Sequence, residues 1–115
     1  MKKVTGRHGE KISADYLEKK GYRILERNYL SRYGEIDIIA VNDKNIIFVE
    51  VKTRVCSPMV TGAESVTSSK QQRVSATASI YLQQNPTELQ PRFDVIAVEY
   101  SKDTFEVTDH IENAF

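Results

Sequence analysis

Two short apolar segments on either side of a polar turn constrain the fold more than any other feature of this sequence. They run from Glu35 to Val41 and from Asn45 to Lys52, and both are rich in Ile and Val. β-Branched and aromatic residues favour strands. The residues between them, Asn42-Asp43-Lys44-Asn45, are types that favour tight turns. The sequence therefore predicts a β-hairpin at the centre of a sheet.

The symmetry of this turn predicts which residues of the hairpin lie opposite each other. With the turn centred between Asp43 and Lys44, Asp37 faces Glu50 and Glu35 faces Lys52. Side chains two apart on a strand share a face, so these four polar side chains should cluster at one end of one face. The other face should be a continuous apolar surface made of Ile36, Ile38, Ala40, Ile47, Val49 and Val51.

Two opposed carboxylates beside an apolar face are unfavourable without a counter-ion. They repel each other, and partial burial adds to the penalty. A hard divalent cation such as Mg²⁺ relieves both problems, because it binds one or two carboxylates together with waters and phosphate oxygens. Lys52 could then orient or deprotonate a water, or stabilise a phosphate. In the alternative interpretation, Lys52 forms a salt bridge with Glu50 or Glu35, and Asp37 caps a backbone group. Four such residues in register favour the functional site.

The rest of the pattern predicts one α/β domain over residues 1–115. A three-layer α/β/α arrangement, with a helix on each face of a central mixed sheet, is the economical architecture. The expected order is α-β-β-β-α-β-β. The two helices are expected at Arg7–Lys20, capped by Thr5, and at Ser68–Gln84, ended by Asn85-Pro86; the further strands are expected at Tyr22–Leu30, Phe93–Tyr100 and Thr104–Thr108, and a loop at Thr53–Glu64.

Composition limits the compartment and the partners. No apolar run approaches the ~18 residues of a membrane span, and no secretory signal is recognisable at the N-terminus. The single cysteine, Cys56, cannot form an internal disulfide, so a cytoplasmic protein is expected. The net charge is zero, but residues 1–34 carry nine Lys/Arg and four Asp/Glu, whereas residues 93–115 carry one Lys and six Asp/Glu. This asymmetry permits a basic face on a neutral protein.

Several motifs resemble a known family. Asp37 followed by a hairpin and by Glu50-Val51-Lys52 resembles the PD-(D/E)xK nuclease signature. The chain is also similar, over nearly its whole length, to the YraN family of small bacterial proteins, which resemble archaeal Holliday-junction resolvases in fold. The segments that carry this second resemblance are Gly6-Arg7-His8-Gly9-Glu10, Gly34-Glu35-Ile36-Asp37, Phe48-Val49-Glu50-Val51-Lys52-Thr53-Arg54, Arg92-Phe93-Asp94-Val95 and Asn113-Ala114-Phe115.

The resemblance implies a restriction-endonuclease-like core and assigns roles to individual residues. Asp37 and Glu50 would bind Mg²⁺ or Mn²⁺ together with the carbonyl of Val51, and Lys52 would be catalytic. Glu10 matches a helix glutamate that approaches the metal in related nucleases; alternatively, it is a first-turn acid stabilised by the helix dipole. If the substrate is a DNA junction, the protein should form a two-fold homodimer. Asp94 is expected to be structural, paired with Arg92 or a turn.

Basic residues near these motifs are candidate contacts to nucleic acid. They are Arg7, Arg54, Lys70 and Arg73, although a single such residue is more often a solvated surface charge. The second helix of similar proteins is rich in Lys and Arg, and here only Lys70 and Arg73 are basic between residues 68 and 79. Phosphate contacts should therefore be few. The sequence predicts a metal-dependent endonuclease acting on branched or single-stranded DNA. The alternatives are a non-catalytic nucleic-acid-binding module on the same fold and an interaction protein with an acidic C-terminal part.

Overall fold

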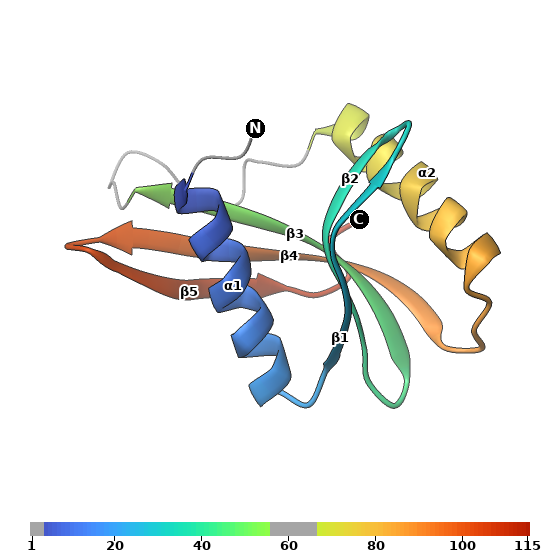
Figure 1. Cartoon of the computed structure of the whole chain (residues 1–115), viewed down its shortest axis with the longest axis horizontal. Helices are drawn as coiled ribbons and strands as arrows, with labels where there is room; N and C mark the ends of the chain where they lie inside the picture. The colour runs from blue at the N-terminus through green and yellow to red at the C-terminus, as the bar shows by residue number, and fades with distance from the viewer. Residues whose placement is uncertain (1–3, 56–66) are drawn as a thin grey trace.

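The structure is a computed structural model that describes residues 4–55 and 67–115. Two helices and five strands follow one another in the predicted order α-β-β-β-α-β-β. Their bounds are α1 Val4–Lys19, β1 Arg23–Ser31, β2 Gly34–Val41, β3 Asn45–Val55, α2 Ser68–Gln84, β4 Gln90–Ser101 and β5 Thr104–Ile111 (Figure 1). Neither helix in the described part of the chain is long and apolar enough to cross a membrane.

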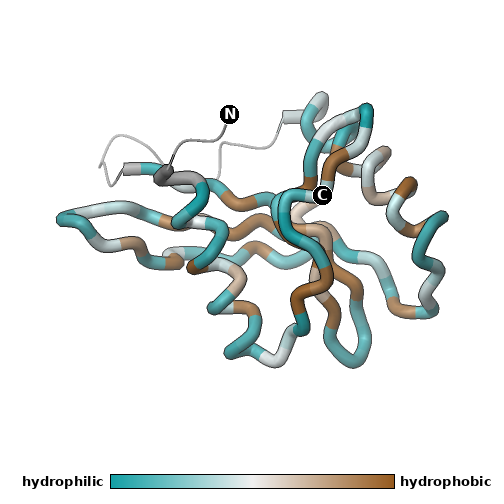
Figure 2. Tube along the Cα trace, in the orientation of Figure 1, coloured by the Kyte–Doolittle hydropathy of each residue, from teal (hydrophilic) through white to brown (hydrophobic). Residues whose placement is uncertain are grey.

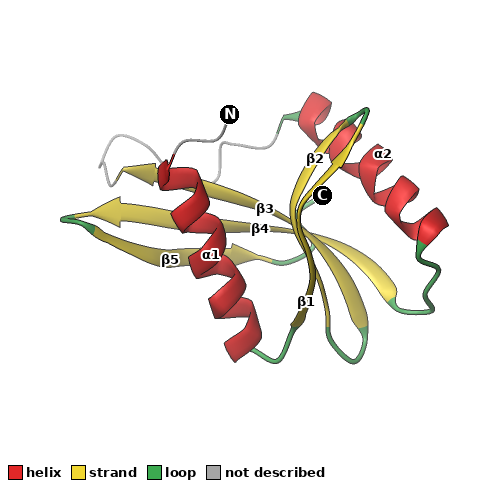
Figure 3. Cartoon of the chain, in the orientation of Figure 1, coloured by secondary structure: helices red, strands yellow, loops and turns green. Residues whose placement is uncertain are grey.

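All five strands form one mixed sheet in the order β1-β2-β3-β4-β5. The β1–β2, β2–β3 and β4–β5 pairs are antiparallel, whereas β3 and β4 are parallel. A parallel pair needs a long crossover, and the connection from β3 to β4 contains α2 (Figure 3). This mixed sheet was predicted, with the crossover helix in the predicted place.

The two helices cover opposite faces of the sheet. Ala14 and Leu17 of α1 belong to a core cluster with Ile47 and Val49 of β3. Val74, Ala78 and Tyr81 of α2 belong to a second cluster with Ile46 and Phe48. Because successive strand residues point to opposite faces, the two clusters lie on the two sides of β3. Apolar positions accordingly concentrate along the central strands (Figure 2). The layering is the predicted α/β/α.

The predicted hairpin register is correct only near the turn. The β2–β3 ladder pairs Val41 with Ile46 and ends where Ile38 pairs with Val49. The predicted pairs of Asp37 with Glu50 and of Glu35 with Lys52 are absent from it. Beyond Val49, β3 continues to Val55 beside β4, without β2 on its other side.

An irregularity at Asp37 explains why β2 leaves β3 at this point. The β1–β2 ladder omits Asn28 and Asp37, which its register would place opposite each other. Asn28 has a φ of 56°, in the left-handed region that Asn tolerates better than most residues. Ile36 and Ile38 therefore pack in different core clusters, although they are two residues apart. The prediction of one continuous apolar face that includes Ile36 was wrong.

Other differences from the prediction concern element ends. The described part of α1 begins at Val4, so Thr5, which was expected to precede the helix, lies within it. β3 extends to Val55, so the expectation that the loop starts at Thr53 was wrong, and the rest of that expected loop, residues 56–64, lies outside the described residues. Helix α2 has the predicted bounds, with Asn85 as its C-cap.

Candidate active site

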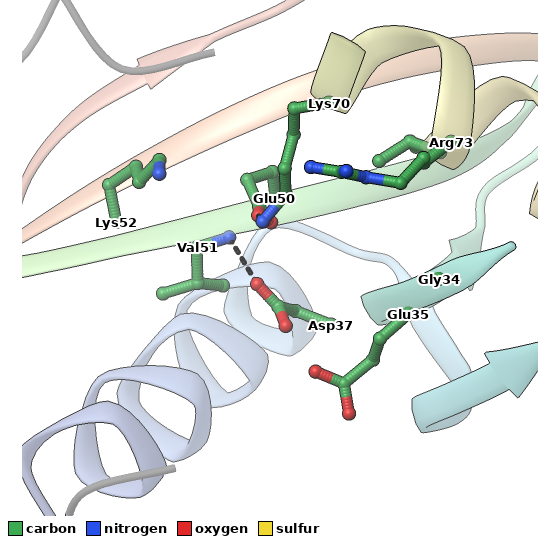
Figure 4. Close-up of a pocket in the computed structure, with 9 residues that line it drawn as sticks. Gly34, Glu35, Asp37, Glu50, Val51, Lys52, Lys70 and Arg73 are labelled. Atoms are coloured by element: carbon green, nitrogen blue, oxygen red, sulfur yellow. Dashed lines mark hydrogen bonds and ion pairs between the residues drawn. The ribbon is translucent and has the colours of Figure 1, made fainter. Parts of the chain in front are cut away.

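A cavity of about 320 Å³ lies where β2 separates from β3, beneath the first turns of α2 (Figure 4). Three carboxylates, two lysines and an arginine surround it. The residues that line it are Gly34, Glu35, Asp37, Glu50, Val51, Lys52, Lys70, Arg73 and Val74. Most of these are predicted site residues, and β2, β3 and α2 bring them together.

Asp37 replaces a missing strand partner. It is only 4% exposed, and its Oδ2 accepts a hydrogen bond of 2.8 Å from the backbone N–H of Val51. That N–H points toward the side of β3 that β2 has left. The carboxylate thus satisfies a donor that the ladder would otherwise have satisfied. The expectation that Asp37 caps a backbone group, made under the salt-bridge alternative, is therefore correct. The N–H and C=O of one strand residue point the same way, so the carbonyl of Val51 lies on the Asp37 side as well.

Glu50 is a buried carboxylate with an ammonium group as its ion-pair partner. It is 4% exposed, and its Oε1 lies 2.7 Å from the Nζ of Lys70 on α2. Burial raises the pKa of Glu50, and the charge of Asp37 raises it further. The charge of Lys70 and its hydrogen bond lower the pKa of Glu50, whereas a hydrogen bond with Asp37 raises it. The resulting pKa of Glu50 is about 7. The two carboxylates are thus close enough to repel, as predicted.

Lys52 lines the cavity without neutralising Glu50. It stands two residues beyond Glu50 on β3, so both side chains project from the same face of the strand. Among residues 4–55 and 67–115, Lys52 has no ion-pair partner, and the partner of Glu50 is Lys70. The salt-bridge alternative for Lys52 and Glu50 is therefore wrong for this part of the chain. Lys52 remains available to a ligand in the cavity.

The start of α2 supplies the basic wall of the cavity. Thr67 caps the helix by accepting a hydrogen bond from the backbone N–H of Lys70, which fixes the first turn. Arg73 lies one turn later and also lines the cavity. Gly34 lies against Arg73 and has a φ of 156°, a backbone conformation that residues with a side chain rarely adopt. Lys70 and Arg73 therefore occupy positions from which an anion in the cavity can be bound.

The other predicted site residues lie outside the cavity lining. Arg7 is exposed on α1. Arg54 forms an ion pair of 3.6 Å with Glu99 of the neighbouring strand β4. Glu10 is 2% exposed and lies in the second turn of α1, whose first turn carries no acidic residue. The first-turn explanation of Glu10 is therefore wrong, and its approach to a metal stays a prediction.

The donors at the cavity suit a hard cation that keeps part of its hydration shell. In the described ranges, no group of three or more His, Cys, Asp or Glu side chains comes together as a metal site. A cation here would have the carboxylates of Asp37 and Glu50, the carbonyl of Val51, and waters or phosphate oxygens. This oxygen set fits Mg²⁺ or Mn²⁺.

Sequence reasoning missed two contacts. It treated Lys70 only as a phosphate contact, although the side chain reaches Glu50 across 20 positions of sequence. It also left His110 unassigned, although His110 Nε2 lies 2.8 Å from Oδ2 of the buried Asp94. No local pattern signals either contact, because both depend on how α2 and β5 pack.

Comparisons with known proteins define the family of this chain. The model of the family described as "Uncharacterised protein family UPF0102" matches residues 9–98. A UPF0102 protein of Caldanaerobacter subterraneus is 46% identical over 99% of this chain and 96% of its own length. One from Alkaliphilus oremlandii is 42% identical over the full length of both chains.

A solved structure, that of Pyrococcus furiosus SfsA in complex with Ca²⁺, is 15% identical with a TM-score of 0.40. It covers 94% of this chain, which spans 63% of the SfsA chain. A similarity this weak does not establish a shared fold.

Proposed function

This chain belongs to protein family UPF0102, the YraN family, and we propose that it is a Mg²⁺- or Mn²⁺-dependent endonuclease with a restriction-endonuclease-like core. The observation that carries the proposal is the buried pair Asp37 and Glu50, which share one cavity with Lys52. The order α-β-β-β-α-β, with the acidic hairpin in the middle and a crossover helix after it, supports the core. Fold alone does not define an activity, so the proposed activity depends on the residues of the cavity.

The residues of the cavity would have two roles in phosphodiester hydrolysis, metal binding and positioning of the attacking water or the phosphate. Asp37 and Glu50 would hold the cation together with the carbonyl of Val51. Bound there, a divalent cation lowers the pKa of a coordinated water and stabilises negative charge on the phosphate. Lys52 has no ion-pair partner within the described residues, and it would orient the attacking water or donate hydrogen bonds to the phosphate oxygens.

Nucleic acid is the substrate class that the charges of the cavity favour. The wall opposite the carboxylates carries Lys70 and Arg73, and Arg binds phosphate through two parallel hydrogen bonds. These are few cations, so phosphate contacts should be limited. Because Lys/Arg also predominate over Asp/Glu in residues 1–34, DNA is the expected ligand, in branched or single-stranded form.

Cleavage assays with matched variants test this function. Labelled single-stranded, duplex and branched DNA would be incubated with Mn²⁺ and with the wild type, Asp37→Asn or Lys52→Ala. The wild type should cut at least one substrate. Asp37→Asn should lose both cleavage and Mn²⁺ binding, and Lys52→Ala should lose cleavage while still binding Mn²⁺. A wild type that binds DNA but cuts none of the three would instead indicate a nucleic-acid-binding module.

A further inference from the structure

The ammonium group of Lys70 is paired with the same carboxylate that a metal in this cavity would need, that of Glu50. Its Nζ lies 2.7 Å from Oε1 of Glu50, within the cavity that also contains Asp37 (Figure 4). A Mg²⁺ ion binds carboxylate oxygens at about 2.1 Å. A cation at that distance from Oε1 would lie no more than about 5 Å from the ammonium nitrogen, so the two positive charges repel each other. Lys70 is thus the counter-ion of Glu50 in the metal-free protein, and it competes with the metal.

Lys70 can leave Glu50 without any change in the fold. Its backbone is fixed by the Thr67 cap of α2, but its side chain is 35% exposed, whereas that of Glu50 is 5% exposed. A lysine side chain has a flexible four-carbon stem and carries its charge at the tip. Rotation about that stem can move the ammonium group away from Glu50 within the cavity, which Arg73 also lines.

Arg73 provides the contrast within the same helix. It lines the same cavity one turn later, but among residues 4–55 and 67–115 its guanidinium forms no ion pair. It is therefore available to an anion whether or not a metal is bound. Lys70 becomes available only when Glu50 has another cation.

We infer that Lys70 couples metal binding to nucleic-acid binding: a metal ion displaces its ammonium group from Glu50, and the released group then binds a substrate phosphate. This inference rests on the proposed function, because it requires a metal at Asp37 and Glu50. It adds that metal and nucleic acid each strengthen the binding of the other. Such coupling is reciprocal by thermodynamic necessity.

Mn²⁺ titration of the wild type and Lys70→Met tests whether Lys70 competes with the metal for Glu50. Calorimetry at about pH 8.5 keeps Glu50 ionised. Lys70→Met should bind Mn²⁺ on the order of tenfold more tightly, because a competing cation has been removed. Arg73→Met is the matched control and should bind Mn²⁺ with nearly wild-type affinity. Equal affinities for the wild type and Lys70→Met would overturn the inference and leave the proposed function intact. If the wild type binds no Mn²⁺ at millimolar concentration, both the inference on Lys70 and the proposed function fail.

Binding of a short single-stranded oligonucleotide tests whether the released Lys70 then binds phosphate, in a Lys52→Ala background that keeps the oligonucleotide intact. Lys70→Met should weaken binding severalfold with Mn²⁺ present and leave it unchanged without Mn²⁺. Arg73→Met should weaken binding to the same degree in both conditions. If Lys70→Met weakens binding equally with and without Mn²⁺, Lys70 is an ordinary phosphate contact and the coupling is refuted.

Discussion

Two buried carboxylates, Asp94 and Glu50, have opposite surroundings in this protein. Asp94 is fully buried and accepts hydrogen bonds of 2.8 Å from both Nε and a terminal nitrogen of Arg92. His110 Nε2 lies 2.8 Å from its Oδ2, and the backbone N–H of Asn113 donates to its Oδ1 at 3.1 Å. Burial alone would raise the pKa of Asp94, but these three partners together lower it to about 2. Asp94 is thus stable as an anion without any ligand.

The ionised form of Glu50, in contrast, is only partly stabilised by its surroundings. Its partner Lys70 does not offset burial and the repulsion of Asp37, so the pKa of Glu50 is raised to about 7. The comparison teaches that burial of an acid does not by itself indicate function. Asp94 joins β4 to the C-terminal segment and serves the fold, as predicted for it. The ionised form of Glu50 is not fully stabilised by Lys70, and a bound cation can stabilise it further.

The largest effect on stability is expected from breaking the Asp94 cluster. Arg92→Met should destabilise the fold by about 3–5 kcal/mol, because it leaves Asp94 buried without its main partner. Lys11→Met is the control, since Lys11 pairs with Asp15 on the exposed surface of α1, where a pair is worth about 0–1 kcal/mol. Urea unfolding of the two variants measures the difference. Equal losses would remove the structural role assigned to Asp94.

The next effect concerns pH and separates the two acids. The pKa of Glu50 is raised in the fold, so its contribution to stability is present below its unfolded value of 4.5 and is lost as pH rises toward 7. The metal-free protein should lose on the order of 3 kcal/mol over that window. Asp94 has a lowered pKa, so its contribution is present above 3.8 and is lost as pH falls toward 2.

Unfolding of the metal-free protein at several pH values between 2 and 8 tests the Glu50 window and the acid limb together. Glu50→Gln should flatten the profile between 4.5 and 7, because it removes the titrating group and keeps the shape. It should leave the acid limb below 3.8 unchanged, since that limb belongs to Asp94. A wild-type profile that rises between 4.5 and 7 would contradict the environment described for Glu50.

The smallest effect on stability is expected at Lys52. Lys52→Met should change the free energy of unfolding by no more than about 0.5 kcal/mol, because no ion-pair partner in the described ranges depends on Lys52. The same variant should cleave no DNA. Thermal unfolding measures the first quantity, and a large loss of stability would show that Lys52 belongs with Asp94 as a structural residue.

Much of the fold could be predicted from the sequence because local rules decide it. The turn at Asn42–Asn45 set the register of the hairpin near its tip, where Val41 pairs with Ile46. The second helix was expected at Ser68–Gln84 and to end at Asn85-Pro86, and α2 has these bounds. These features depend on residues close together in the chain.

The site was predicted correctly in composition and wrongly in geometry. Asp37, Glu50 and Lys52 do share a cavity, but Asp37 and Glu50 are not a ladder pair. The strands separate at Asp37, where Asn28 on β1 has a positive φ. The β2–β3 hairpin alone does not signal this separation. The positive φ is on the neighbouring strand β1, and Ile36 of β2 packs against residues of α2.

A Mn²⁺-soaked crystal tests the central claim most directly. The account predicts one anomalous peak between Asp37 and Glu50, within about 2.3 Å of a carboxylate oxygen of each and of the Val51 carbonyl. It also predicts that the Lys70 ammonium group has moved away from Oε1 of Glu50. A crystal soaked at millimolar Mn²⁺ that shows no peak there, with Lys70 still paired to Glu50 at 2.7 Å, would contradict the account.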